Sequence, residues 1–171
     1  MKLLLTSGGV TNPSIENALV NLLGTPISES KAIFIPTAVH GQRNSPQMMR
    51  RVMTGDGMPP MINMGWQSID YLELTSLPSA GKETWKDAVR ETDAILVWGG
   101  DPMFLTYWMR ESGFADLLPT LPGNIVYCGM SAGSMVLTPD IGEDFVNWQQ
   151  PGGGHKTLGL VQFSIFPHLE H

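Results

Sequence analysis

The chain has 171 residues, of which 42% are hydrophobic and 15% charged, and these values are typical of one soluble globular domain with a sizeable core. Ten scattered lysines and arginines and a formal net charge of −6 exclude the basic surface of a nucleic-acid-binding protein. One cysteine excludes an intrachain disulfide and a cysteine-rich metal site. No apolar run approaches the roughly 20 residues of a membrane span, and the opening run Leu3-Leu4-Leu5 is too short for a signal peptide. We therefore expect a single cytoplasmic domain over residues 1–171.

The first third of the chain alternates between apolar strands and helices. Lys2 to Leu5 predicts a buried strand that ends at the turn Ser7-Gly8-Gly9. Asn12-Pro13 predicts a helix start, because asparagine caps helices and proline suits the first helical position. Residues 32–35 predict a second strand. The methionine-rich stretch 47–67 contains glycines and prolines, so it predicts a broken helical segment.

The rest of the chain repeats this alternation, with one long loop near the end. Ile69 to Leu74 predicts a third strand and Ala94 to Trp98 a fourth, which Gly99-Gly100-Asp101-Pro102 follows at once. The other predicted elements are helices at 82–91, 103–112 and 114–121, a strand at 124–128, a helix at 132–137, a loop at 138–156 and a last strand at 158–166. This order predicts an α/β three-layer sandwich with a mostly parallel central sheet.

Three glycine-containing turns fall on the same edge of this predicted sheet. They follow the strands that end near Leu5, Trp98 and Cys128. Ligands of open parallel sheets bind outside the carboxyl ends of the strands. We therefore expect the three turns to meet at one active site.

Ser131 lies in the sequence Gly129-Met130-Ser131-Ala132-Gly133, which has the spacing G-x-S-x-G. A serine between glycines at a strand-to-helix junction is typical of a nucleophile elbow, with its hydroxyl exposed above a helix N-terminus. The same pattern also fits a tight turn with a helix-capping serine. Catalysis therefore requires further residues around Ser131.

A serine nucleophile needs a base, and four histidines are available. His168 is the best candidate, because it ends the last strand-like run and Pro167 restricts its backbone. His40 could reach the same edge but has no supporting context. His155 lies in a glycine-rich loop in which a fixed geometry is not expected, and His171 lies at the very end of the sequence.

A carboxylate usually orients such a base, and backbone N–H groups usually bind the oxyanion. Glu143 and Asp144 lie between Ser131 and His168, and either is a candidate, with Asp140 as a weaker third. For the oxyanion hole, Ala132 follows the nucleophile and Gly99-Gly100-Asp101 supplies a glycine turn that allows close approach to the substrate.

The chain resembles the peptidase E family of serine peptidases, family S51, which includes aspartyl dipeptidases and is related to cyanophycinase. The resemblance lies in the opening strand Leu3-Leu4-Leu5, in Val97-Trp98-Gly99-Gly100-Asp101, in Gly129 to Gly133 and in the run from Leu158 to Pro167-His168. It implies a fold similar to that of class I glutamine amidotransferases and a dipeptidase activity without a cofactor. It also implies Ser131 as nucleophile, His168 as base, and Glu143 or Asp144 as acid, with Asp144 slightly favoured.

Two departures from the family pattern affect what the resemblance implies. Asp101 stands where the family usually has asparagine, which places a charge near the expected oxyanion hole. The sequence ends three residues after His168, whereas family members continue through further strands and a helix. We therefore expect the domain to lack C-terminal elements of the family, and the recognition of aspartate is not carried over to this chain. An exposed sheet edge would favour a homodimer.

Three other functions fit the sequence less well. A catalytically silent domain that binds a small molecule would have the same fold. A glutaminase on this fold normally carries cysteine at the elbow, whereas Cys128 lies three residues earlier, inside a strand. A metal site at His168 to His171 lacks a helix signal and a third ligand. We therefore expect a small peptide as substrate, and no metal.

Overall fold

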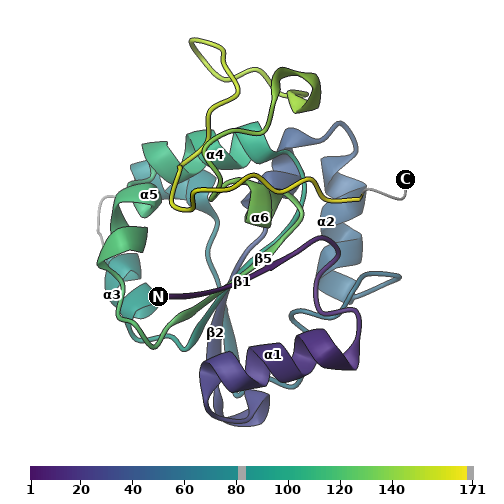
Figure 1. The fold of residues 1–171 in the computed structure, drawn as a ribbon, viewed down its shortest axis with the longest axis vertical. Coiled ribbons are helices and arrows are strands. Elements are labelled where there is room, and N and C mark those ends of the chain that lie inside the picture. Colours follow the sequence, from purple (N-terminus) through teal and green to yellow (C-terminus); the bar gives the residue numbers. More distant parts are fainter. Residues whose placement is uncertain (81–83, 169–171) are drawn as a thin grey trace.

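The computed structural model describes residues 1–80 and 84–168 and contains one central sheet of five parallel strands (Figure 1). The strand order is β1-β5-β4-β2-β3. The strands are β1 (Lys2–Thr6), β2 (Lys31–Ile35), β3 (Ser68–Tyr71), β4 (Ala94–Val97) and β5 (Val126–Met130). Every pairing between them is parallel, so their carboxyl ends share one edge.

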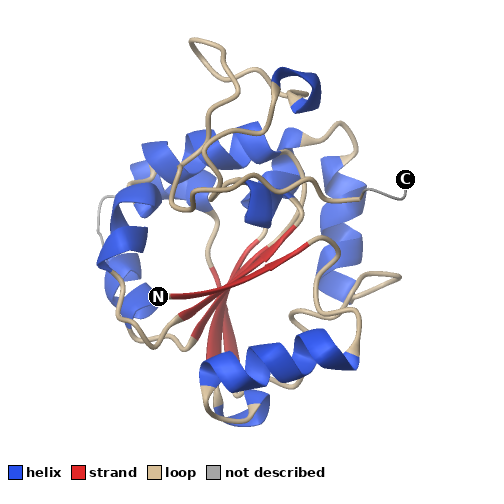
Figure 2. Cartoon of the chain, viewed as in Figure 1, coloured by secondary structure: helices blue, strands red, loops and turns tan. Residues whose placement is uncertain are grey.

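Helices surround this sheet, as Figure 2 shows. They are α1 (Pro13–Leu23), α2 (Ser45–Thr54), α3 (Thr84–Arg90), α4 (Pro102–Glu111), α5 (Phe114–Leu117) and α6 (Ala132–Met135). Successive strand residues point to opposite faces. Ile33 and Ile35 accordingly pack in one hydrophobic cluster with residues of α3, α4 and α5, while Ala32 and Phe34 pack in another with residues of α1 and α2. The predicted three-layer α/β sandwich is confirmed.

The helix starts follow local signals in the sequence. Oδ1 of Asn12 accepts a hydrogen bond from the N–H of Ile15 at 3.0 Å, and Pro13 is the first residue of α1. Asp101 caps α4 in the same way, and Pro102 is its first residue. The predicted helix start at Asn12-Pro13 is therefore confirmed, and the cap at Asp101 is an addition from the structure.

The predicted last strand at 158–166 is wrong. The segment forms no strand, and it runs past α6 as an irregular chain (yellow in Figure 1). The N–H groups of Leu158, Gly159 and Val161 donate to carbonyl groups of residues 136–138, which form the turn after α6. Gly159 also has a φ of +66°, which lies outside the extended region of a strand. The backbone of this segment therefore follows the turn after α6, where Leu158 and Val161 join the core while Phe163 and Phe166 are exposed.

Other predicted boundaries shift by a few residues. The methionine-rich stretch is helical only as far as Thr54, after which Gly55 adopts a φ of +70° and ends the helix. The third strand ends at Tyr71, before the predicted Leu74. In the predicted helix at 82–91, residues 82 and 83 lie outside the described residues.

Several expectations from the sequence stay predictions. In the part of the chain that the structure describes, no helix is both long and apolar enough to cross a membrane. Cytoplasmic location, a homodimer and a single domain over residues 1–171 remain expectations.

The glycines of the G-x-S-x-G sequence let α6 lie directly on the sheet. A Cβ at Gly129 would lie 2.6 Å from the carbonyl oxygen of Gly133. A Cβ at Gly133 would overlap the carbonyl oxygen of Val97 in β4. Because these contacts are with backbone atoms, side-chain rotation cannot relieve them. The two glycines therefore set the position of α6 on β4 and β5.

This close contact makes the chain intolerant of a methyl group at Gly133. We expect Gly133→Ala to lower the free energy of unfolding by about 1–3 kcal/mol, because overpacking of this size forces the backbone to shift. Gly123→Ala is the matched control, because a Cβ there would meet no atom within 4 Å. Urea unfolding of both variants measures the difference, and equal stability of the two would contradict the account.

Candidate active site

Ser131 occupies a strained turn between β5 and α6. Its φ of 50° and ψ of −113° lie in a region that residues other than glycine rarely adopt. Its N–H donates to the carbonyl of Thr6 at 3.0 Å, and its carbonyl accepts from Ser134 and Met135 at 2.8 and 2.9 Å. Hydrogen bonds on both sides thus hold the strained conformation in place.

Thr6 and Ser134 join the end of β1 to this turn. The hydroxyl of Ser134 donates to the carbonyl of Thr6 at 2.8 Å and accepts from its N–H at 3.0 Å. The hydroxyl of Thr6 donates to the carbonyl of Gly129 and accepts from the N–H of Gly9. Both residues are buried, and sequence reasoning did not find their role. The one available signal was a polar threonine at the end of an apolar strand.

His168 lies beside Ser131, as the sequence predicts for a base. Its Nε2 is 3.1 Å from Oγ of Ser131, which is hydrogen-bonding distance. Its backbone N–H donates to Oγ of Ser7 at 3.0 Å, and its φ of 62° is left-handed. Ser7 therefore fixes the backbone that carries the imidazole ring, and it is a third residue whose role sequence reasoning missed.

The glycine turn after β4 lies against the short 3-10 turn of residues 37–41. Gly100 has a φ of 146°, and a Cβ there would overlap the carbonyl of Ala38. The N–H of Asp101 donates to that same carbonyl at 2.9 Å. Asp101 was expected to contribute to the oxyanion hole, but its N–H is already used in this way. Gly100 and Ala132 remain as candidate donors, since Ala132 begins α6 and has no intrahelical acceptor.

The carboxylate of Asp101 binds three backbone N–H groups and does not line the cavity at Ser131. Its Oδ1 accepts from the N–H groups of Met103 and Phe104 at 2.9 and 2.8 Å, and its Oδ2 accepts from the N–H of Trp148 at 3.0 Å. Burial raises the pKa of this carboxyl above its ordinary value, and these three hydrogen bonds oppose the rise. The expected charge near the oxyanion hole therefore serves as the cap of α4 and as an anchor for the 143–150 loop.

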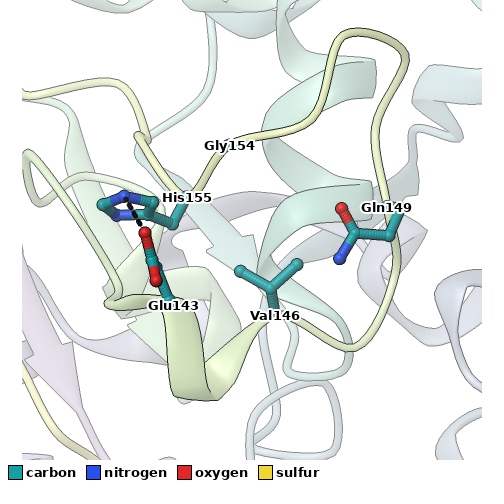
Figure 3. A pocket seen from close by; sticks show the side chains of 5 residues that line it. All are labelled: Glu143, Val146, Gln149, Gly154 and His155. Atoms are coloured by element: carbon teal, nitrogen blue, oxygen red, sulfur yellow. Dashed lines mark ion pairs between the residues drawn. The ribbon is translucent and has the colours of Figure 1, made fainter.

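Glu143 lies in a different hollow from Ser131. Figure 3 shows its ion pair with His155. Oε1 of Glu143 is 3.7 Å from Nε2 of His155, and Oδ1 of Asp140 is 2.7 Å from the other ring nitrogen, Nδ1. The hydrogen bond to His155 holds the pKa of the Asp140 carboxyl below its ordinary value. His155 therefore has a defined geometry between two carboxylates, which the expectation of a flexible loop did not foresee. Asp144, in the same short turn as Glu143, is exposed.

The other candidates from the sequence lie apart from Ser131 or carry an inert group. Nε2 of His40 is 3.2 Å from Oε2 of Glu73, so this ring interacts with Glu73. Burial raises the pKa of Cys128 to about 12, so this thiol stays protonated at neutral pH, which disfavours a cysteine nucleophile. Among the residues that the structure describes, no group of three His, Cys, Asp or Glu side chains could hold a metal ion. The segment 169–171 of the metal hypothesis lies outside them.

Ser131 and His168 open into a cavity of about 640 Å³, a size that suits a small ligand. Its walls come from the turns after β1 and β4, from β5, and from α2 with the loop that follows it. The lining residues are Ser7, Gly8, Thr11, Gln42, Met48, Met58, Pro59, Trp98, Gly99, Gly100, Met130, Ser131 and His168. The three turns that the sequence places at one edge of the sheet therefore meet in this cavity.

Comparison with known proteins gives one family. Residues 3–171 match the family model described as peptidase family S51. No curated protein sequence matches the chain significantly.

Two solved structures share the fold. A putative peptidase E protein from Listeria monocytogenes EGD-e is 21% identical, with a TM-score of 0.64 over 99% of this chain and 80% of that one. A peptidase from an acI-B1 Actinobacterium is 17% identical, with a TM-score of 0.69 over 98% of this chain and 68% of that one. At these identities the likeness concerns the fold alone.

The contacts of Asp101 predict how its variants behave. We expect Asp101→Ala to lower the free energy of unfolding by about 1–2 kcal/mol, because α4 loses its cap. Asp101→Asn keeps an Oδ1 acceptor for Met103 and Phe104 and should lose less. Urea unfolding of both variants tests this, and an equal loss in both would contradict the assigned capping role.

The position of Glu143 predicts that it does not orient His168. We expect Glu143→Gln to leave the rate at which a neutral fluorophosphonate labels the protein close to that of wild type. A carboxylate that orients the base should instead matter by orders of magnitude. The comparison with Asp144→Asn tests the other carboxylate of the same turn. A loss of about 100-fold or more in Glu143→Gln would restore Glu143 as the acid.

Proposed function

Since the chain belongs to peptidase family S51, we propose that it is a serine peptidase that cleaves a small peptide or amide through an acyl-enzyme on Ser131. The observation that carries the proposal is the 3.1 Å distance between Nε2 of His168 and Oγ of Ser131. The cavity of about 640 Å³ around them suits a substrate as small as a dipeptide.

The proposed reaction begins with neutral His168. It accepts the hydroxyl proton of Ser131 as Oγ attacks the carbonyl carbon of the substrate, and the carbonyl oxygen becomes an oxyanion. His168 then gives this proton to the leaving nitrogen, the C–N bond breaks, and the acyl group stays on Ser131 as an ester. A water molecule then attacks the ester as His168 takes one of its protons. The bond between the acyl carbon and Oγ breaks, His168 returns the proton to Oγ of Ser131, and the acyl group leaves as a carboxylic acid.

Two backbone N–H groups are proposed to bind the oxyanion, those of Gly100 and Ala132. Gly100 lines the cavity beside Ser131, and Ala132 carries the first N–H of α6, where the helix dipole favours negative charge. One such donor contributes about 100-fold to 1000-fold in rate when it is positioned before the reaction. The close packing of Gly100 against Ala38 supports such positioning.

Asp144 is proposed as the carboxylate that orients His168. Glu143 is engaged by His155, so Asp144 remains the candidate from the same turn. Its assignment rests on the sequence and on the family resemblance, and Asp144→Asn decides it.

Labelling with a neutral fluorophosphonate tests the proposed pair. We expect Ser131→Ala to abolish labelling, because the reacting oxygen is gone, and His168→Ala to slow it by about 100-fold to 10,000-fold. His155→Ala is the matched control, because its ring is held by Asp140 in the other hollow, and it should label like wild type.

Two results would contradict the proposal. Labelling that survives in Ser131→Ala would place the reactive group elsewhere. Absence of labelling in folded wild-type protein would favour a catalytically silent binding domain, and circular dichroism of each variant controls for folding.

A further inference from the structure

The methionine-rich stretch after β2 forms one wall of the Ser131 cavity. Met48 on α2 and Met58 in the loop after it both line this cavity. The N–H of Val10 donates to the carbonyl of Pro60 at 3.3 Å, which ties the loop to the turn after β1. The broken helix therefore presents methionine side chains to the cavity that holds the proposed nucleophile.

Met130 and Trp98 continue this apolar wall beneath Ser131. The side chain of Met130 lies close to both glycine turns. A Cβ placed on Gly9 would be 3.2 Å from its Sδ, and a Cβ placed on Gly99 would be 3.2 Å from its Cε. The ring of Trp98 packs edge-to-face on Phe34 with centroids 5.8 Å apart. The wall thus combines a fixed indole with thioether side chains that adapt to the shape of a ligand.

None of the described residues that line the cavity is a lysine or an arginine. Among its described lining residues, His168 is the only titratable group, and it faces Ser131. Arg50 and Arg51 line a separate hollow, and Arg51 donates to the carbonyls of Asp56 and Gly57. The formal net charge of −6 also repels an acidic ligand at long range.

We propose that the residue on the acyl side of the scissile bond carries an uncharged, apolar side chain of the size of leucine or methionine, rather than that of aspartate. The side chain lies against Met48, Met58, Met130 and Trp98, while the carbonyl carbon faces Ser131. This specificity rests on the proposed function, because it assumes that substrate acylates Ser131.

Matched phosphonate inhibitors test this specificity directly. In a diphenyl α-aminoalkylphosphonate, Oγ of Ser131 attacks phosphorus, one phenoxide leaves, and His168 takes the serine proton. We compare isobutyl, carboxymethyl and aminobutyl side chains on otherwise identical probes. We expect the isobutyl probe to label wild type at least about tenfold faster than either charged probe, as apolar pockets discriminate by about this factor or more.

Lysine substitutions then test the assigned wall. We expect Met58→Lys, and independently Met48→Lys, to slow labelling by the isobutyl probe and to accelerate labelling by the carboxymethyl probe, because a cation then faces the bound side chain. The ratio of the isobutyl rate to the carboxymethyl rate should fall about tenfold or more. Met58→Leu should keep the wild-type ratio. Met53→Lys is the matched control, because Met53 is 54% exposed and does not line the cavity, so its ratio should not change.

The outcomes separate the two proposals. If the neutral fluorophosphonate labels Ser131 but the carboxymethyl probe reacts faster than the isobutyl probe, the apolar specificity is overturned and the serine peptidase stands. The specificity is also overturned if Met58→Lys and Met48→Lys, folded by circular dichroism, keep the wild-type ratio. If no probe labels Ser131, the proposed function itself fails.

Discussion

The backbone contact between α6 and the sheet is the constraint on which the site depends. Gly129 and Gly133 leave no room for a side chain, so α6 begins directly above β4 and β5. One residue must then turn the chain from strand to helix, and Ser131 does so with a φ of 50°. The hydrogen bonds of Thr6 and Ser134 hold this strained turn. The close backbone packing at Gly129 and Gly133 therefore places the hydroxyl of Ser131 at the carboxyl edge of the sheet.

The parallel sheet gathers the other parts of the site around that hydroxyl. The carboxyl ends of β1, β4 and β5 are neighbours or next neighbours, so Ser7, Gly100 and Ser131 converge although they are far apart in the sequence. His168 lies outside the sheet, on a segment that is hydrogen-bonded to the turn after α6. Its own N–H donates a hydrogen bond to Ser7. The site therefore depends on one irregular segment as much as on the regular elements.

Local patterns in the sequence predicted the sandwich, the turn at Ser131 and the position of His168 at the same edge of the sheet, because strand hydrophobicity, glycine spacing and helix caps act over a few residues. Partners across the chain were not predictable in this way. The roles of Thr6, Ser7 and Ser134 depend on contacts between neighbouring strand ends, and Glu143 reaches His155 because of the path of its loop. The strand expected at 158–166 failed for the same reason, since its backbone N–H groups bind carbonyl groups of the turn after α6 instead of a neighbouring strand.

The most direct test of an activated Ser131 is the burst of leaving group released from a p-nitrophenyl ester, combined with mass spectrometry of the protein during the burst. The account predicts one equivalent of p-nitrophenol per active protein and an acyl group on the peptide that contains Ser131. Steady release of p-nitrophenol without a burst would agree with an activated Ser131 only if the acyl group still accumulates on Ser131 at low pH. An acyl group found on another residue, or none at all in folded protein, would contradict the account.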